Sequence, residues 1–418
     1  MQEFINRQFF NLTLFTLIFG VMLYDTIGLL GFTYVDEICA ALLFFLFVYK
    51  VIHSPGWAFY RLLLVVLGVF LFYLVYSLVI ATNVKSAIFL DFFIQLKPYL
   101  AFCCVYAIKP EFNASRRKLI RQVIALCCIY TFVSGFPSPV TDVFLDYTFG
   151  HASRLATAST ALALLYLYCS NYTRNEKIIF VLILSIGLLS TRSKHYGFTA
   201  FCTLLVFFIN DSFNLKWNTK NVLFVSAAVA LTLLVSWKKI YFYFITGGFG
   251  GGRAADNLYA RMALYFFSTF VLMDFIPFGP GFGTYATYAS ATYYSPIYVK
   301  YGMQNMHGMT KDLPAFISDT YYPALAQFGF VGVLLFFWFW GRLGVKALRR
   351  FQSGFRKEAV LAFIILVFFL IECTSDSTIT HNRGIFILMI LGLVFSDMNP
   401  QKTPPVEVGN SEQIPSTV

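Results

Sequence analysis

Long hydrophobic runs separated by short polar segments fill most of this chain. The runs predict helices near 9–24, 36–51, 61–81, 87–108, 119–136, 154–170, 177–190, 196–210, 221–240, 321–341, 358–373 and 383–397. Several are shorter than the ~20 residues that a helix needs to cross a bilayer upright. The pattern predicts an all-α polytopic membrane protein, in which residues 1–400 form one transmembrane domain of about 12 helices.

Composition supports lipid as the main solvent. Hydrophobic residues make up 58% of the chain and charged residues only 12%, whereas a soluble domain carries about 25% charged residues. The net charge of +11 does not indicate a nucleic-acid partner, because the basic residues lie in short loops and not on one polar face. The chain has neither a C-x-x-C pair nor a phosphate loop nor a D-x-D pair, so no metal and no cofactor are predicted.

The distribution of Lys and Arg predicts the orientation. With the N-terminus in the cytoplasm, 19 of the 31 basic residues fall on inner segments and 5 on short outer loops. Basic residues concentrate on the cytoplasmic side of membrane proteins. Both termini are therefore expected in the cytoplasm, including a polar, disordered tail at 401–418.

One outer loop, 241–320, is far longer than the others, and long loops are usually functional or disordered. It contains a glycine run at 247–252 and an amphipathic stretch near 256–276, which predicts a helix at the membrane surface. It also contains a cluster of tyrosines. We predict that Tyr285, Tyr288 and Tyr321, just beyond the loop, contact sugar, although aromatic side chains with a hydroxyl equally suit a belt at the membrane interface.

Six cations lie on the predicted outer side, where the positive-inside rule disfavours them: Arg154, Arg192, Lys194, Arg253, Arg261 and Arg383. The guanidinium group is a rigid fork of donors that suits phosphate oxygens. We therefore favour a shared anion site. The alternative is that each cation reaches lipid phosphates or pairs with Asp142, Asp146, Asp256 or Asp376.

Few groups could act as a base. Asp319 and Asp376 are the best-placed carboxylates for taking a proton from an acceptor hydroxyl, and His195 could be a base or an anion donor. Asp319 could instead cap the helix predicted to begin at 321, and His195 could simply be solvated.

Three segments in order resemble the O-antigen polymerase and O-antigen ligase superfamily. The first runs from Leu188 to Ser193 and is followed by Tyr196 and Gly197. The second is Arg261, leading to the Pro-Phe-Gly-Pro-Gly-Phe-Gly segment 277–283. The third is Ser-Asp-Thr-Tyr-Tyr at 318–322, continuing to the Gly-Phe-Val-Gly segment 329–332.

The resemblance implies a GT-C-like membrane glycosyltransferase that is metal-independent and inverting. Its donor would be an oligosaccharide on a polyprenyl diphosphate, at the outer face of the bacterial cytoplasmic membrane. Arg192 and Arg261 would bind the diphosphate, with Arg154 and Arg253 as neighbours. A chain-length regulator is an expected partner of polymerases of this kind.

Three functions remain open at this stage. Ligases resemble one another in a His at the start of the tenth helix, where this chain has Ser318 and Asp319, so a polymerase is favoured over a ligase. A flippase for lipid-linked oligosaccharides would place charges along a central path in many helices, whereas Lys97 is the clear mid-helix cation here.

Overall fold

The structure, a computed structural model, describes residues 1–54, 56, 60–136, 143–208 and 253–398. Within these ranges the chain is helical and contains no strand, which confirms the all-α prediction. Five helical stretches are long and apolar enough to cross a membrane: Gln2–Met22, Arg61–Ile80, Lys85–Ile108, Ala114–Gly135 and Tyr322–Gln352. The predicted helix at 221–240, the glycine run and the tail lie outside the described residues, so the total of about 12 spans stays a prediction.

The first half of the chain supplies helices at each predicted position up to 210. They are α1 (Gln2–Phe15), the π-helical η1 (Thr16–Met22), α2 (Tyr24–Gly28), α3 (Val35–Ile52), α4 (Arg61–Ile80), α5 (Lys85–Ile108), α6 (Ala114–Gly135), α7 (Val143–Phe149), α8 (Ala152–Cys169), α9 (Arg174–Ile186), the 3₁₀ turn η3 (Gly187–Ser190) and α10 (Ser193–Phe208). Local signals fix some ends. Thr173 and Glu176 form a capping box that starts α9, and Asn113 accepts a bond from the Arg116 amide at the start of α6.

The second half begins with a helical lobe where a long loop was predicted. Its elements are α12 (Arg253–Asp274), α13 (Tyr288–Thr292), α14 (Pro296–Lys300) and η5 (Met303–Asn305). The chain then returns through η6 (Tyr322–Phe328), α15 (Gly329–Gln352), α16 (Arg356–Glu372), η7 (Thr378–Thr380) and α17 (Asn382–Asp397). The lobe has its own apolar core, which includes Leu264, Val271, Tyr285 and Tyr298. It is thus a folded unit and not a plain connection.

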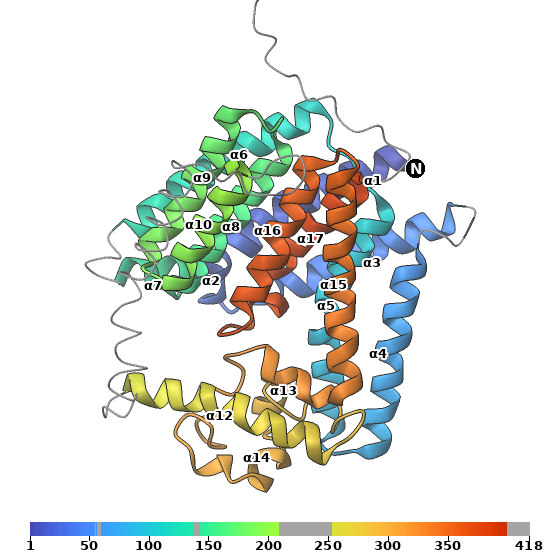
Figure 1. Cartoon of the computed structure of the whole chain (residues 1–418), viewed down its shortest axis with the longest axis vertical. Coiled ribbons are helices and arrows are strands. Elements are labelled where there is room, and N and C mark those ends of the chain that lie inside the picture. Colours follow the sequence, from blue (N-terminus) through green and yellow to red (C-terminus); the bar gives the residue numbers. More distant parts are fainter. Residues whose placement is uncertain (55, 57–59, 137–142, 209–252, 399–418) are drawn as a thin grey trace, which may run out of the picture.

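The helices form a bundle with the lobe at one end (Figure 1). The core of the bundle lies around α8 and α17, where Leu155–Cys169 and Asn382–Ser396 are buried on every side. A helix that is apolar all round belongs in the centre of a bundle. α4, α5 and α15 are long enough to run from the bundle to the lobe, as Figure 1 shows.

α12 is apolar on two sides. Ala260, Leu264 and Val271 pack into the lobe core, while Met262, Phe266 and Met273 are each at least 60% exposed. The predicted amphipathic stretch is therefore a helix with an unburied apolar stripe, which is typical of a helix at a membrane surface.

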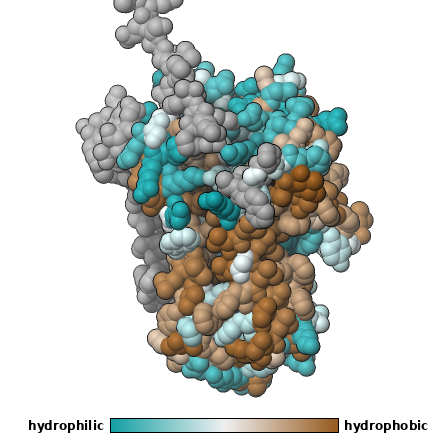
Figure 2. Space-filling view, turned by 90° about the vertical axis from the view of Figure 1, so that its right-hand side faces the viewer, coloured by the Kyte–Doolittle hydropathy of each residue, from teal (hydrophilic) through white to brown (hydrophobic). Residues whose placement is uncertain are grey.

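A broad hydrophobic area covers the middle and lower part of the face shown in Figure 2, with hydrophilic residues gathered toward its upper end and at its lower edge. Both α4 and α15 carry apolar side chains that are more than half exposed, among them Leu71, Val75, Leu334 and Phe337. A contiguous apolar surface of this kind is expected to face lipid.

Candidate functional site

Charged side chains from several separate segments gather near the ends of the bundle helices that lie toward the lobe. We call this group the polar cluster: Asp25, His151, Arg154, Arg192, Lys194, Arg261, Asp319, Glu372, Asp376, His381 and Arg383. Five of them lie in the first or last turn of a helix, and the others, apart from Arg261 within α12, lie in the connections between helices. The α16–α17 connection, which carries several members, faces the lobe in Figure 1.

The Asp25 carboxylate forms ion pairs with two arginines. The Arg383 Nη2 donates to Asp25 Oδ2 at 2.6 Å, and Arg154 pairs with the other oxygen of the same carboxylate. Arg383 is buried and also donates from Nε to the Val21 carbonyl at 3.1 Å. The Arg154 side chain is 49% exposed. Arg383 is therefore held in place by buried contacts, whereas part of the Arg154 guanidinium group is exposed beside the polar cluster.

Arg192 contacts a histidine at the start of α8. Its Nη2 lies 2.6 Å from His151 Nε2, and His151 Nδ1 lies 2.7 Å from the Ser153 hydroxyl. Burial, together with the charges of Arg192 and Arg154, lowers the pKa of His151. The imidazole is thus neutral near pH 7 and can accept a bond from the guanidinium. This contact aims Arg192 toward the start of α8.

The third pair ties α10 to α16. Lys194 Nζ lies 2.6 Å from Glu372 Oε1 and 3.3 Å from the Ser375 hydroxyl. Glu372 is buried. Lys194 neutralises its carboxylate, so the buried charge at the edge of the apolar bundle is paired.

Arg261 and Asp319 form the pair that belongs to the lobe. Arg261 Nη2 lies 3.0 Å from Asp319 Oδ2, and the two side chains are 38% and 30% exposed. The Arg261 Nε is buried and has no hydrogen-bond partner among the described residues, which is a costly arrangement unless a ligand completes it. Burial raises the pKa of Asp319, although the Arg261 guanidinium acts in the opposite direction. Because the pair is partly exposed, another anion can replace the Asp319 carboxylate as the partner of Arg261.

The helix-capping interpretation of Asp319 is wrong. η6 begins at Tyr322, and its N-cap residue Tyr321 makes no side-chain cap bond. The Asp319 carboxylate pairs with Arg261 instead.

Asp376 links the lobe pair to the rest of the polar cluster. It accepts a bond from the Thr378 hydroxyl at 2.7 Å, and its charge influences the pKa of His151, Asp319 and His381. Two further bonds join the lobe side to the α16–α17 connection. The Tyr265 hydroxyl donates to the Thr374 carbonyl at 2.9 Å, and the Ser377 hydroxyl to the Ser318 carbonyl at 2.8 Å.

Seven residues singled out from the sequence therefore belong to the polar cluster: Arg154, Arg192, Lys194, Arg261, Asp319, Asp376 and Arg383. His195 does not join them. Its ring is buried, and its Nε2 lies 3.0 Å from the Leu184 carbonyl, between α9 and α10. It is a packing residue, so neither the role as a base nor the solvated alternative fits its position.

The tyrosines separate into different environments. Tyr285 is fully buried and donates to the Leu264 carbonyl at 2.6 Å, and Tyr321 is buried as well. Neither ring is free to stack on a sugar. Tyr288 is 59% exposed on α13 and keeps that possibility. Arg253 is the first residue of α12, and its side chain lies outside the described residues.

The glycine-rich segment 277–283 is an anchor for the lobe and not an anion cradle. Its amides are already used: the Gly281 N–H donates to the Gln327 carbonyl at 2.9 Å, and the Gly283 N–H to Asp91 Oδ2 at 2.8 Å. An anion-binding loop needs free N–H groups that point at the ligand. This segment instead fastens the lobe to α5 and η6.

Three members of the polar cluster escaped the sequence analysis: Asp25, His151 and Glu372. Asp25 and Glu372 both lie at the predicted outer end of a helix, so the predicted topology could have singled them out. His151 directly precedes the helix that carries Arg154 and is its N-cap residue. Among the described residues, no group of three His, Cys, Asp or Glu is arranged to hold a metal ion.

No family model matches the sequence, and comparisons with curated proteins and with solved structures gave no significant match.

Proposed function

We propose that this chain is a glycosyltransferase that polymerises oligosaccharide repeat units carried on a polyprenyl diphosphate. The proposed location is the outer face of the bacterial cytoplasmic membrane, with both termini in the cytoplasm, about 12 spans and a GT-C-like arrangement. The product would be an O-antigen or another surface polysaccharide. The proposal rests on the resemblance of three segments and on one observation about the fold.

That observation is the linkage of three arginines through two neighbouring groups. Arg154 and Arg192 lower the pKa of His151, Arg261 lowers that of Asp319, and the charge of Asp376 acts on both groups. The three arginines come from α8, the start of α10 and α12, which are far apart in the sequence. A diphosphate leaving group gathers charge on several oxygens as its bond to the sugar breaks, and several guanidinium forks would stabilise that charge.

The position of the polar cluster fits an outer site. α15 follows Asp319 after η6 and ends with Arg349 and Arg350 in its last turn. Its 24 residues span about 36 Å at 1.5 Å per residue. A basic end on one side and the polar cluster on the other is the polarity expected of a protein with its basic end in the cytoplasm.

The chemistry would be a displacement at the anomeric carbon of the donor sugar. The acceptor hydroxyl oxygen forms the new bond to that carbon, and the bond between the carbon and the diphosphate oxygen breaks. Asp319 takes the hydroxyl proton, for which a raised pKa is suited. The diphosphate replaces Asp319 as the partner of Arg261, which frees the carboxylate at the moment when a base is needed.

Lys97, the cation in the middle of a helix, offers little support for a transporter function. Lys97 lies 2.6 Å from Asp36 and 2.5 Å from Glu37, at the start of α3. It therefore neutralises a neighbouring helix end, and it is not a free charge along a path through the bundle.

The test is to replace Arg192 and Arg261 by Ala in cells and to compare surface polysaccharide on a gel with the amount of protein in the membrane. Lys311→Ala is the matched control, because Lys311 is an exposed cation of the same lobe that lies outside the polar cluster. We expect each arginine variant to lose roughly a hundredfold in long chains or more, at normal protein level, while single repeat units remain on their final acceptor.

The other outcomes separate the alternatives. Repeat units found only on the polyprenyl carrier, with none on the final acceptor, would identify a ligase. Carrier-linked units trapped on the cytoplasmic side would identify a flippase. Normal polysaccharide in both arginine variants would refute the diphosphate site.

A further inference from the structure

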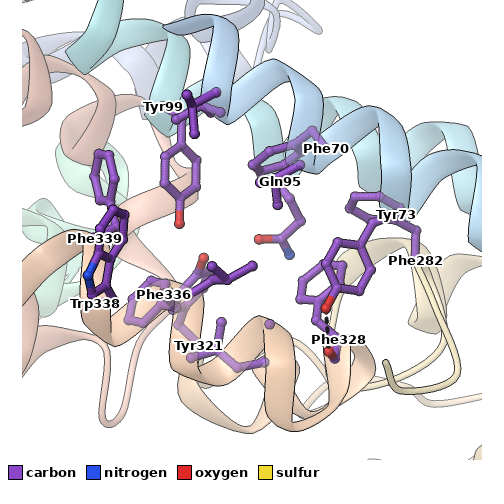
Figure 3. Close-up of a pocket in the computed structure, with 16 residues that line it drawn as sticks. Phe70, Tyr73, Gln95, Tyr99, Phe282, Tyr321, Phe328, Phe336, Trp338 and Phe339 are labelled. Atoms are coloured by element: carbon purple, nitrogen blue, oxygen red, sulfur yellow. Dashed lines mark hydrogen bonds between the residues drawn. The ribbon is translucent and has the colours of Figure 1, made fainter. Parts of the chain in front are cut away.

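An apolar groove lies between α4 and α15, with α5 and η6 as its floor. It holds about 730 Å³ of space, including its open mouth. In Figure 3 the rings of Phe70, Tyr73, Tyr99 and Phe336 surround this space, and the Gln95 amide reaches into it. The lining is otherwise almost wholly apolar.

The groove opens sideways onto the apolar surface of Figure 2. Val65 on α4 and Trp338 on α15 line it and are each more than half exposed. Both helices belong to stretches that are apolar and long enough to cross a membrane. A molecule could therefore enter from the bilayer without passing through water.

Away from the lobe, the groove continues into a second hollow and meets three cations. The second hollow shares Val65 and Trp338 with the first, and it is also lined by Arg61, Arg342 and Lys346. Arg342 lies over the Trp338 ring, 5.2 Å from its centroid, and Lys346 donates to the Tyr106 hydroxyl at 2.8 Å.

None of the three cations forms an ion pair with a carboxylate in the part of the chain that the structure describes. Arg61 and Arg342 are both exposed. An apolar groove that ends in unneutralised positive charge is complementary to a molecule with an apolar chain and an anionic head.

We infer that this composite groove binds one anionic phospholipid. An acyl chain lies between α4 and α15, and the headgroup phosphate lies against Arg61, Arg342 and Lys346. The lipid belongs to the cytoplasmic leaflet, because these cations are near the basic end of α15. The lipid site itself does not depend on the proposed glycosyltransferase activity, and only the argument against the polyprenyl carrier as its occupant rests on that proposal.

The polyprenyl carrier is a poorer occupant of the cationic end. Its diphosphate is expected at the polar cluster, near Arg261 and Asp319. Arg342 and Lys346 lie 13 and 17 residues beyond the start of α15, or about 20 and 26 Å along the helix. A diphosphate held by Arg261 would therefore lie against residues other than Arg61, Arg342 and Lys346.

The experiment measures lipid binding to the full chain by native mass spectrometry in detergent, with phosphatidylglycerol and phosphatidylethanolamine titrated separately. We expect wild type to retain one phosphatidylglycerol preferentially. The triple variant Arg61→Gln, Arg342→Gln, Lys346→Gln should bind it roughly tenfold more weakly or worse, since each cation near a headgroup contributes severalfold. The matched control is Arg7→Gln, Lys118→Gln, Arg174→Gln, which removes three exposed cations elsewhere on the predicted inner side and should bind normally.

A second pair of variants tests the apolar part. Val65→Trp fills the groove and should weaken phosphatidylglycerol binding, whereas Val75→Trp adds the same ring at an exposed α4 position outside the lining and should not. Size-exclusion profiles check that all variants are folded.

Three results would overturn the inference. The first is equal retention of the two lipids by wild type, and the second is an equal loss in the control triple variant. The third is displacement of phosphatidylglycerol from wild type by polyprenyl phosphate at equal concentration, which would assign the groove to the carrier lipid.

Discussion

The Asp25 carboxylate is the partner of two arginines that lie far from it in the sequence, and Arg383 is 358 residues away. Arg383 is fully buried beside it, whereas Arg154 is half exposed. A buried cation that loses its counter-charge is left uncompensated, and breaking such a pair from one side typically costs about 3–5 kcal/mol. Asp25 is thus expected to matter for stability more than any exposed carboxylate near it.

Asp25→Asn should therefore lower the thermal midpoint of the purified protein by several degrees, through loss of roughly 3 kcal/mol. Asp146→Asn is the control, because Asp146 is exposed on α7 and lies near His151 without a described ion pair. Equal midpoints for the two variants would mean that solvent or lipid already neutralises Arg383.

The proposed role of Asp319 as the base of the polymerisation leads to a prediction about pH. A base must be deprotonated, so activity falls as the pH falls through its pKa. Burial raises the pKa of Asp319, so the acid limb of the polymerisation rate should lie above the ~3.9 of an ordinary Asp. Arg261 opposes that shift. Arg261→Gln should consequently move the acid limb of the residual rate to higher pH, and Asp319→Asn should abolish the limb.

The measurement is the initial rate of chain extension with purified lipid-linked repeat units across pH. The control is Asp312→Asn, which changes an exposed carboxylate of the same segment and should leave the profile unchanged. An acid limb that stays in place in Arg261→Gln would exclude Asp319 as the group responsible.

At the scale of elements, the glycine-rich segment 277–283 holds the lobe against the helix bundle. Gly279 has a φ of +77° and packs so closely on η6 that a Cβ would overlap the Gln327 carbonyl. The Tyr76 hydroxyl of α4 donates to its carbonyl at 2.9 Å. The close approach permits the bonds that hold α4 and η6 to the start of the lobe.

Gly279→Ala should therefore destabilise the protein much more than Gly302→Ala. Gly302 has a similar φ of +69° but open space around it, so Ala there meets only the left-handed backbone strain of roughly 1–2 kcal/mol. Gly279→Ala adds a clash with the backbone. Membrane protein level and thermal midpoint report the difference, and similar values for the two variants would show that the segment can move away without loss.

The start of the tenth predicted helix shows where pattern reading fails. The apolar run predicts one helix over 321–341, but the chain forms the 3₁₀ turn η6 first and α15 only from Gly329, whose φ is +60°. α15 then continues to Gln352. Its last two turns are amphipathic and basic, so hydrophobicity alone ends the helix too early.

For the whole molecule, the polar cluster and the lobe lie at one end of the bundle, and the basic last turn of α15 lies toward the other. If this polarity follows the positive-inside rule, the lobe faces outward. A Cys placed at Lys311 in the lobe should react with a membrane-impermeant maleimide in intact cells. A Cys at Lys118, on α6, should react only after the cells are opened.

The native cysteines make this labelling test practical. Seven are buried, and Cys128 is only partly exposed, so background labelling should be low. Labelling of the Lys118→Cys variant in intact cells would reverse the proposed orientation and remove the polar cluster from the outer face.

Much of the fold is determined by the sequence alone, because a run of apolar residues with helical spacing is a local property. It predicts α4 at 61–81, and the helix is Arg61–Ile80. Sequence reasoning also singled out Arg154, Arg192 and Arg261, because cations on the predicted outer side of a membrane protein are unusual.

Only the tertiary structure decides which groups meet. Asp25 joins Arg383, His151 joins Arg192, and Asp319 turns to Arg261. His195 and Tyr285 look as polar in sequence as their neighbours, yet both end in apolar cores. Pairing and burial depend on distances across the bundle between segments far apart in the chain. No local pattern of residues carries that information.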